Sequence, residues 1–177
     1  GKQLAEWIYI RRATSFDEMT NISLKGREAL KERYTVGRYA PIAEAISKDG
    51  TKKYLFRISN SKRSERSNSE AVYIESVYLP EEDRATLCVS TQAGCKMGCK
   101  FCMTGTLGFH GHLAAADILN QIFSIPDADK LTNIVYMGEG EPMDNLDNVL
   151  RSLEAMTSAW GCAWSPKRIT ISSVGIN

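Results

Sequence analysis

The sequence lacks any hydrophobic run long enough to cross a membrane. No apolar stretch of the 177 residues approaches the ~20 that a bilayer-spanning helix needs. The first residues also lack the pattern of an export signal, a positively charged start followed by an apolar segment. The remaining composition, 43% hydrophobic and 24% charged, is that of a globular domain. We therefore expect a cytoplasmic protein that makes no membrane contact.

The chain also has almost no net charge, +1, but its charges are unevenly distributed. Residues 1–70 contain 15 lysines and arginines against 9 acidic residues, whereas residues 71–177 contain 7 against 12. A basic front half favours contact with a polyanion, and an acidic back half that carries cysteines suits a charged cofactor. An uneven solvated surface is the alternative explanation for a difference of this size.

Cysteines are few, and their arrangement argues against a disulfide framework. There are five, an odd number, and Cys95, Cys99 and Cys102 fall within eight residues. A secreted disulfide-rich domain spreads its cysteines along the chain and usually pairs them all. Clustered thiols therefore indicate a reducing compartment and a bound metal.

The front of the chain predicts a small basic helical domain. Apolar residues recur at roughly helical spacing over residues 2–10, and residues 24–34 place Lys, Arg and Glu on an outer helical face. Ser15 and Glu18 form a capping-box pattern that predicts another helix start. We assign residues 1–40 to this accessory domain.

Residues 41–84 predict a β-hairpin that links the accessory domain to the rest of the chain. Strand-forming residues mark two strands, at 53–58 and at 71–79. Residues 59–70 between them are rich in Ser, Asn, Lys and Arg and predict an exposed loop. This loop is basic enough to touch nucleic acid, but a merely solvated loop has the same composition.

From residue 85 onward the pattern is a repeated β/α winding. We expect strands at 86–90, 132–137 and 168–172, with helices at 113–125 and 145–159. This order predicts an α/β fold, either a parallel barrel or a doubly wound sheet. Because the winding stops after its third strand, it would leave an open sheet edge. We therefore expect residues 85–177 to be the first half of a barrel, and the chain to be a fragment.

The spacing C-x3-C-x2-C of Cys95, Cys99 and Cys102 suits an iron–sulfur cluster better than zinc. A [4Fe-4S] cluster takes four ligands, so three nearby thiolates leave one iron open to a small molecule. Glycines at positions 94, 98 and 105 let the loop wrap around such a cluster. A structural zinc site needs four closed ligands, and it stays an alternative. Its fourth ligand would come from Cys88, His110, His112 or Cys162.

Two blocks of the sequence resemble a known family. A C-x3-C-x2-C loop just after a first β-strand is the signature of radical SAM enzymes. Residues 84–108, RATLCVSTQAGCKMGCKFCMTGTLG, closely resemble the RlmN/Cfr family of RNA adenine methyltransferases, and so do residues 136–142, YMGEGEP. The resemblance implies a partial radical SAM (β/α) barrel and two cofactors, a [4Fe-4S] cluster and S-adenosylmethionine (SAM).

The resemblance also implies which residues hold the cofactors. Cys95, Cys99 and Cys102 match the family's cluster ligands. Gly140 and Glu141 match a SAM-binding glycine and glutamate, in a loop at the carboxyl end of a barrel strand. Glu141 has no obvious basic partner in the sequence and could accept a hydrogen bond from the SAM amino group. Ser172 matches a serine that contacts SAM at the end of the next strand.

Two further residues match catalytic positions of the family. Cys88 matches a cysteine that forms a transient disulfide with a methyl-carrying cysteine and so releases methylated RNA. Glu75 matches a glutamate assigned as the proton acceptor. By their own sequence context, Cys88 would be a small core residue and Glu75 a carboxylate that faces solvent. Cys162 matches no role, and we expect it to be a packing residue.

The implied reaction uses two SAM molecules. The first methylates a cysteine near the family's carboxyl end, and the second gives a 5′-deoxyadenosyl radical that abstracts hydrogen from that methyl group. The carbon radical then adds to an electron-poor adenine carbon, for which C2 is favoured over C8, and Cys88 resolves the adduct. No cysteine follows Cys162, so the methyl-carrying cysteine is not among these residues. We expect the chain alone not to complete turnover.

The implied substrate is RNA, either 23S ribosomal RNA, tRNA or both, with a flavodoxin-like external electron donor and a monomeric enzyme. Lysines and arginines of the accessory domain would contact phosphates and give a salt-sensitive affinity. The candidates are Arg11, Arg12, Lys25, Arg27 and Lys31. The alternatives are a C8-methylating resistance enzyme of the same family and a non-catalytic iron–sulfur or zinc module that binds nucleic acid.

Overall fold

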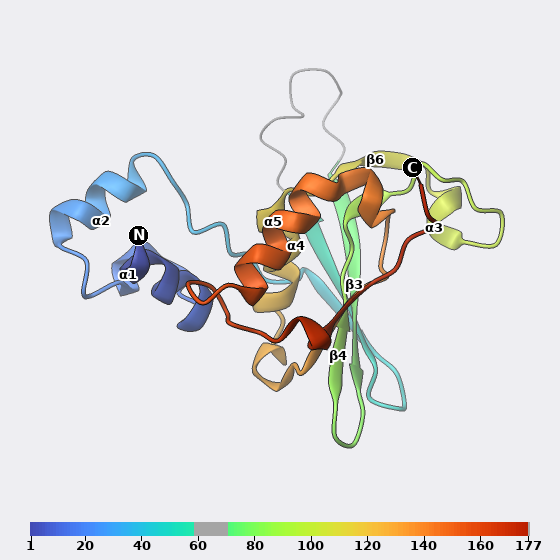
Figure 1. Cartoon of the computed structure of the whole chain (residues 1–177), viewed down its shortest axis with the longest axis horizontal. Coiled ribbons are helices and arrows are strands. Elements are labelled where there is room, and N and C mark those ends of the chain that lie inside the picture. Colours follow the sequence, from blue (N-terminus) through green and yellow to red (C-terminus); the bar gives the residue numbers. More distant parts are fainter. Residues whose placement is uncertain (59–70, 177) are drawn as a thin grey trace.

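A six-stranded sheet with the order β1-β2-β3-β4-β7-β8 forms the centre of the molecule (Figure 1). The structure is a computed structural model that describes residues 1–58 and 71–176. The basic loop expected at 59–70 lies outside the described residues. The strands of the sheet are β1 (Ala43–Ile46), β2 (Lys52–Ile58), β3 (Val72–Pro80), β4 (Ala85–Cys88), β7 (Asn133–Tyr136) and β8 (Ile169–Ile171).

The sheet changes from antiparallel to parallel at β4. Strands β1 to β4 pair antiparallel, whereas β4, β7 and β8 pair parallel. Parallel neighbours need crossover connections, which here contain α4 (Ala115–Phe123) and α5 (Leu146–Thr157). The predicted α/β class with a parallel sheet is confirmed, and the strands expected as a hairpin continue that same sheet. Closure into a barrel stays a prediction.

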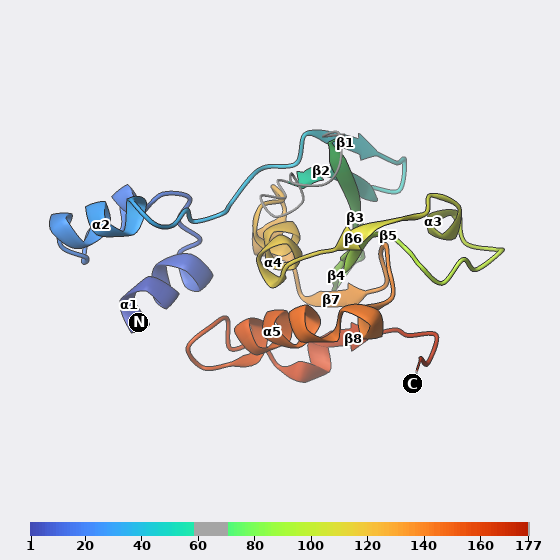
Figure 2. The same cartoon turned by 90° about the horizontal axis from the view of Figure 1, so that it is seen from above.

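The register of the strands gives the sheet two unlike faces. Leu87 on β4 and Ile134 on β7 stand side by side and are fully buried in the core that includes residues of α4 and α5. One residue further along, Cys88 stands between Val77 and Val135, and all three are only half-buried. Successive side chains of a strand point to opposite faces. Cys88 therefore belongs to the face that α4 and α5, which lie together on the other side, leave uncovered (Figure 2).

The accessory segment has a small core of its own at one end of the molecule (Figure 1). Ala13, Phe16 and Met19 form this core and are at most 6% exposed. The helix predicted at residues 2–10 is present over those residues, whereas the one predicted at 24–34 ends at Lys31. The helices around the core are α1 (Lys2–Ala5), which continues as the π-helical turn η1 (Glu6–Ile10), the 3-10 turn η2 (Phe16–Glu18) and α2 (Leu24–Lys31). The predicted capping box of Ser15 and Glu18 is present at η2. The domain boundary at residue 40 stays a prediction that this separate core supports.

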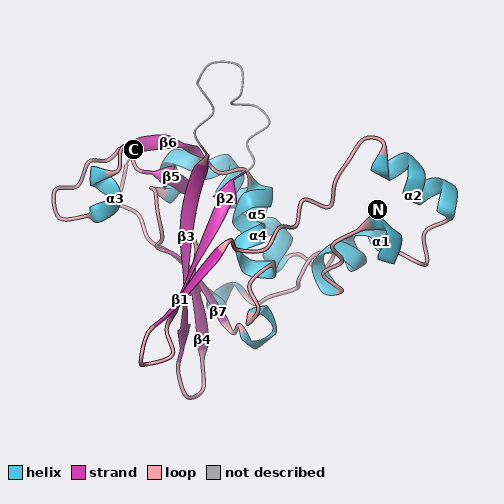
Figure 3. Ribbon diagram, turned by 180° about the vertical axis from the view of Figure 1, so that it is seen from behind, coloured by secondary structure: helices cyan, strands magenta, loops and turns pink. Residues whose placement is uncertain are grey.

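Several short elements are absent from the sequence-based prediction. Strand β1 is four exposed residues without hydrophobic alternation. A hairpin of β5 (Gln92–Gly94) and β6 (Phe109–His112) flanks the cysteine loop, which also holds the one-turn helix α3 (Met103–Thr106) (Figure 3). Elements of three or four residues are too short for periodicity to reveal them. The remaining 3-10 turns are η3 (Ala128–Lys130), η4 (Pro142–Asn145) and η5 (Pro166–Arg168).

Within residues 1–58 and 71–176, no helix combines the length and the apolar character that crossing a bilayer requires.

Candidate functional site

Glu75 and Cys88, the candidate catalytic residues, lie on the same uncovered face of the sheet. Strands β3 and β4 are antiparallel, and Val77 is the residue opposite Cys88. Glu75 precedes Val77 by two residues, so its side chain points to the same side as that of Cys88. The register thus brings the two candidates to one face.

The two side chains differ in their surroundings. Burial raises the pKa of the Cys88 thiol, and a hydrogen bond with the Met137 backbone opposes the shift. The Glu75 carboxylate pairs with Lys53, at 3.1 Å from Oε2 to Nζ, and its side chain is 45% exposed. Cys88 is therefore a protonated, half-buried thiol at neutral pH, whereas Glu75 is in contact with both solvent and a cation.

The cysteine loop runs between β5 and β6. The N–H of Cys95 donates to the carbonyl of Gly108 at 3.0 Å, which closes the loop at its base. Further along, the N–H of Cys102 donates to the carbonyl of Cys99 at 3.0 Å. Gly94 precedes Cys95 with a φ of +68°, and a Cβ there would stand 1.8 Å from the Gly108 oxygen. Only glycine fits at the entry to this loop.

The thiols of the loop have the chemistry of a cluster site, but they are not gathered into one. Cys95, Cys99 and Cys102 are free and half-buried. A hydrogen bond from the Gly105 backbone is the largest influence on the pKa of Cys102 and lowers it, which favours the thiolate. Three such thiols are the donor set for a cluster with one open iron, so the residues fit the predicted group. Among the described residues, however, no three His, Cys, Asp or Glu side chains are close enough to hold a metal ion. Binding would have to draw the thiols together.

The turn that follows β7 packs closely against the connection between β4 and β5. Gly140 has a φ of +97°, and a Cβ there would lie 2.5 Å from the Cβ of Gln92. At Gly138, a Cβ would lie 2.7 Å from the hydroxyl oxygen of Ser90. Both positions exclude a side chain, so the backbone of the predicted SAM-binding turn is held against its neighbour.

Glu141 is buried, at 3% exposure, and its carboxylate has partners within the chain. Oε1 accepts from the N–H of Met143 and Oε2 from the N–H of Val174, each at 2.9 Å. Burial acts to raise the pKa of Glu141, but these two donors and Ser173 outweigh it and leave the pKa lowered. The carboxylate is therefore charged. A carboxylate has about four acceptor positions, so it can still accept from an external amino group, although it does not depend on one for a partner.

Ser172 completes one edge of the parallel strands. It directly follows β8, is exposed, and donates its N–H to the carbonyl of Tyr136 at 3.4 Å. Tyr136 is the last residue of β7, and Cys88 is the last residue of β4. The carboxyl ends of the three parallel strands thus bring Cys88, the Gly140 turn and Ser172 to one edge, the place where β/α folds present their binding groups.

Gln92 and Glu139 belong to the same edge, and the sequence-based prediction missed both. Gln92 is fully buried, and its Oε1 accepts from the N–H of Glu141 at 2.9 Å. The Glu139 carboxylate accepts from the N–H groups of Glu75 and Gly94, at 3.0 and 3.1 Å. The partners lie between 45 and 64 residues apart and meet only through the register of the sheet. Neither periodicity nor motif spacing could have indicated these bonds.

Known proteins align with nearly all of this arrangement. A family model described as the ribosomal RNA large subunit methyltransferase N-terminal domain matches residues 1–36. A probable dual-specificity RNA methyltransferase RlmN of Porphyromonas gingivalis is 59% identical over 99% of this chain and 48% of its own length. The dual-specificity RNA methyltransferase RlmN of Geobacter sulfurreducens is 43% identical over 99% of this chain and 46% of its own. Over nearly its whole length the chain is similar to proteins of the RlmN family.

A solved structure agrees with this similarity. The crystal structure of a radical SAM methyltransferase from Sphaerobacter thermophilus matches with a TM-score of 0.84 and 32% identity, over 99% of this chain and 50% of that one. The predicted resemblance to the RlmN/Cfr family is thereby confirmed. The chain spans about half the length of the curated relatives it matches.

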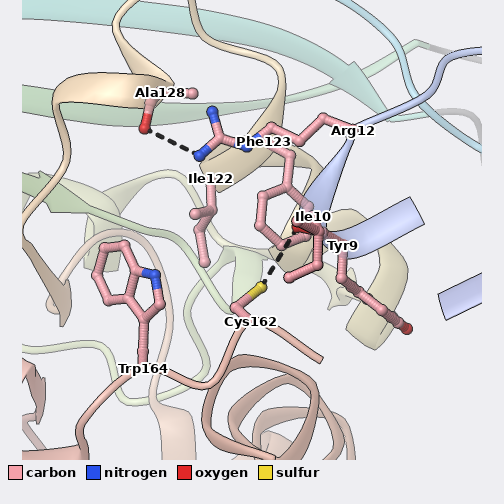
Figure 4. Close-up of a pocket in the computed structure, with 8 residues that line it drawn as sticks. All are labelled: Tyr9, Ile10, Arg12, Ile122, Phe123, Ala128, Cys162 and Trp164. Carbon is pink, nitrogen blue, oxygen red and sulfur yellow. Dashed lines mark hydrogen bonds between the residues drawn. The ribbon is translucent and has the colours of Figure 1, made fainter. Parts of the chain in front are cut away.

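Cys162 lies away from the candidate site, against the accessory segment. Its thiol donates to the carbonyl of Tyr9 at 3.8 Å and faces a cavity that Arg12 and Trp164 also line (Figure 4). Burial raises the pKa of Cys162 to about 11. A buried thiol of this kind suits the packing role expected for it. None of the five cysteines forms a disulfide, so the disulfide expected at Cys88 has no support here.

Four of the five predicted phosphate contacts are engaged within the chain. Arg11 pairs with Glu6 and stacks on Trp7, with 4.5 Å from its guanidinium carbon to the ring centroid. Arg12 pairs with Asp129. Arg27 donates to the Asp17 carbonyl at 2.8 Å, and Lys31 pairs with Asp17 and Glu28. Lys25 is exposed. A phosphate at Arg11 or Lys31 would therefore compete with a carboxylate that is already there.

Proposed function

We propose that this chain is the cluster-binding and SAM-binding part of a radical SAM methyltransferase that modifies an adenine carbon in RNA. The observation that carries the proposal is the assembly at one edge of the parallel strands, where the free thiol of Cys88, the tightly packed Gly140 turn and Ser172 meet beside the cysteine loop. Relatives named RNA methyltransferase RlmN align over 99% of the chain, which supports the same activity.

Each candidate residue has a physical task in this proposal. Cys95, Cys99 and Cys102 would hold the cluster, whose bound form supplies one-electron chemistry to SAM. Gly140 lets the turn pack directly against Gln92, which would hold the turn backbone in place for a ligand. Glu141 keeps a buried negative charge beside that turn, which suits the ammonium group of an amino acid.

Cys88 and Glu75 would act on the RNA side of the reaction. Burial keeps the Cys88 thiol protonated, so it stays unreactive until a base removes its proton. Glu75 lies on the same face, and its exposed carboxylate can accept a proton from a substrate base. Its pairing with Lys53 places a cation 3.1 Å from Oε2.

The names of the relatives support an RNA target. We favour adenine C2 over C8 because the aligned relatives are named RlmN, and their dual specificity fits both 23S ribosomal RNA and tRNA as substrates. Electrons would come from an external flavodoxin-like donor. The exposed Lys100 gives the cysteine loop a positive charge that suits an acidic donor, whereas Lys96 pairs with Asp144 at 2.8 Å. We expect the enzyme to act as a monomer in the cytoplasm.

The first test is anaerobic reconstitution of the chain with iron and sulfide, followed by EPR of the reduced protein with and without SAM. A [4Fe-4S]⁺ signal whose g-values move on addition of SAM is the expected result, because an open iron can chelate the cofactor. Replacing Cys95 by Ala should abolish cluster uptake. Cys88→Ala and Cys162→Ala are matched controls that should keep it, since neither thiol lies in the loop.

The other outcomes separate the alternatives. A cluster signal that does not respond to SAM would argue against a SAM site at the Gly140 turn. Zinc in place of iron would favour the structural-metal module. Loss of iron in Cys88→Ala as complete as in Cys95→Ala would overturn the division of roles between the two cysteines.

A further inference from the structure

The Glu139 carboxylate joins three parts of the candidate site. Glu139 lies in the turn after β7, between two glycines, and its side chain is half-buried. Oε1 accepts from the N–H of Glu75 on β3 at 3.0 Å, and Oε2 accepts from the N–H of Gly94 at 3.1 Å. One side chain therefore ties the predicted SAM-binding turn to the predicted proton acceptor and to the residue directly before Cys95.

The main chain of Glu139 is held just as firmly as its side chain. Its carbonyl accepts from the N–H groups of Thr91 and Gln92, at 2.9 and 3.2 Å. Its N–H donates to the hydroxyl of Ser90 at 2.9 Å, and that hydroxyl donates to the carbonyl of Glu75 at 2.6 Å. With its own backbone fixed, the carboxylate is a rigid bridge and not a mobile surface group.

The bridge replaces hydrogen bonds that the sheet itself cannot make. In the register of β3 with β4, Cys88 stands opposite Val77, so the position opposite Glu75 is Ser90. Strand β4 ends at Cys88, however, and the N–H of Ser90 turns away to Gln121. A longer β4 would have paired with the carbonyl and the N–H of Glu75. Here the Ser90 hydroxyl donates to that carbonyl, and the Glu139 carboxylate accepts from that N–H.

A carboxylate is the group that this position requires. Two N–H groups approach it from different strands, and only two acceptor oxygens can satisfy both. The pKa of Glu139 is raised, mainly by burial and further by the nearby Glu75 carboxylate. The two N–H donors and His110 oppose this shift. A glutamine would present one oxygen and one NH₂ group, and the NH₂ group would face an N–H.

We propose that Glu139 is a positioning residue. Its carboxylate holds the start of the cysteine loop and the backbone of Glu75 in fixed positions relative to the SAM-binding turn. This inference rests on the proposed function for its chemical meaning. Its structural content, the two hydrogen bonds, can be tested without any cofactor. Gly94 has no space for a side chain, so the bond from its N–H to Glu139 is a contact that sets where Cys95 begins.

The direct test uses the unaltered chain without iron. An NMR experiment that transfers magnetisation across hydrogen bonds should correlate the ¹⁵N of Gly94 and of Glu75 with the side-chain carboxyl carbon of Glu139. Absence of both correlations, with those of the sheet present, would overturn the proposal whatever the variants do.

The second test compares Glu139→Gln with Glu154→Gln, which removes the same charge from the exposed face of α5. Loss of one acceptor should speed hydrogen exchange of the Gly94 or the Glu75 amide on the order of tenfold in Glu139→Gln. The amide of Val89, bonded to Val135 in the sheet, should not change and reports whether the fold persists. Unchanged exchange at both Gly94 and Glu75 would overturn the proposal.

Cluster loading then separates this inference from the function on which it rests. In reconstituted protein, Glu139→Gln should take up less iron per chain and show a smaller SAM-induced shift of the EPR g-values than Glu154→Gln. If the unaltered chain forms no cluster, the proposed function fails, while the NMR result still decides whether the bridge exists. If the unaltered chain and Glu139→Gln load and respond to SAM alike, the positioning role fails and the proposed function stands.

Discussion

At the scale of a single residue, two separate features of Gly140 exclude a side chain. Its φ of +97° lies where residues with a Cβ are strained, and a Cβ would also lie 2.5 Å from Gln92. Gly37 has the first restriction, with a φ of +71°, but nothing lies within 4 Å of its Cβ position. The two glycines therefore form a matched pair in which backbone strain and close approach can be told apart.

Gly140→Ala should lower the free energy of unfolding more than Gly37→Ala does. Strain alone costs about 1–2 kcal/mol at each site, and only Gly140→Ala must also push Gln92 aside. Gln92 accepts from the N–H of Glu141, so its displacement should also weaken the SAM-induced EPR shift. Urea unfolding and EPR of both variants check this. Equal unfolding losses in the two variants would mean that the close approach to Gln92 has no energetic weight.

The sequence predicted the residues of the motifs but not the residues that hold them in place. Cys95 and its partners were found because their spacing is itself the signal, and Gly140 because residues 136–142 resemble a block of the RlmN/Cfr family. Glu139 has an ordinary surface-type side chain between two glycines, and its role comes from Glu75 and Gly94, which are distant in sequence. Hydrogen bonds between residues so distant in sequence depend on the register of the strands, which a local sequence pattern does not predict.

At the scale of elements, Asp127 fastens the antiparallel strands to the β/α part of the sheet. It lies in the connection between α4 and β7, at 5% exposure. Its carboxylate accepts from Lys52 at 2.6 Å and from the Tyr54 hydroxyl at 2.9 Å, both on β2, and from Lys130 at 2.9 Å. A buried carboxylate with three donors binds two otherwise separate elements.

Asp127→Asn should lower the free energy of unfolding by about 2 kcal/mol at pH 7, with a pH dependence of known sign. Burial acts to raise the pKa of Asp127, but Lys52, Lys130 and Tyr54 outweigh it and lower the pKa to about 2. The folded-state pKa thus lies below the ordinary value of about 3.9, so the carboxylate stabilises above that value and loses its contribution as pH falls through about 2.

The gap between Asp127→Asn and the unaltered chain should therefore close as pH is lowered from about 4 to about 2. Urea unfolding across that interval measures it. Asp83→Asn removes an exposed carboxylate from the turn between β3 and β4 and is the matched control. A gap that stays constant down to pH 2 would show that Asp127 acts through shape and not through charge.

The sequence predicted those strands in which buried and exposed residues alternate, and it did not predict strands without that alternation. Strand β2 and β3 show that alternation, and their predicted bounds differ from the observed ones by a single residue at most ends. Strand β1 is exposed throughout, and β5 and β6 carry three or four residues each. The expected strand at 86–90 ends at Cys88, because the backbone of Ser90 leaves the ladder to bond Gln121.

At the scale of the whole molecule, the accessory segment meets the rest through Tyr9, Arg12, Arg38 and Tyr39. Tyr9 meets Phe123 and Trp160 edge-on, with ring centroids 6.2 and 5.6 Å apart. Arg38 donates to the Phe123 carbonyl and lies over that ring. A cavity of about 400 Å³ opens between these residues and α4 and α5. Sequence reasoning could predict the helical segment and the β/α winding, but not this joint, whose residues have no pattern in common.

Tyr9→Ala should loosen the accessory segment while the sheet stays intact. The segment keeps its own core of Ala13, Phe16 and Met19, so it should remain folded but lose its fixed position against α4 and α5. Hydrogen exchange read by mass spectrometry should rise in α4, which Tyr9 covers through Phe123, and stay unchanged in β3. Tyr34→Ala, which removes an exposed ring of the same segment, is the control.

The same variant decides whether residues 1–40 form a domain. If the segment is a domain, the unfolding of the sheet in Tyr9→Ala should occur at the same denaturant concentration as in Tyr34→Ala, because the sheet keeps all of its own core. If the two parts form one cooperative unit, removing the joint should lower the stability of the whole chain, and exchange should rise in β3 as much as in α4. The proposed RNA contact favours the first result. A basic segment that folds on its own core can adjust to a folded RNA without disturbing the edge where Gly140 and Ser172 meet.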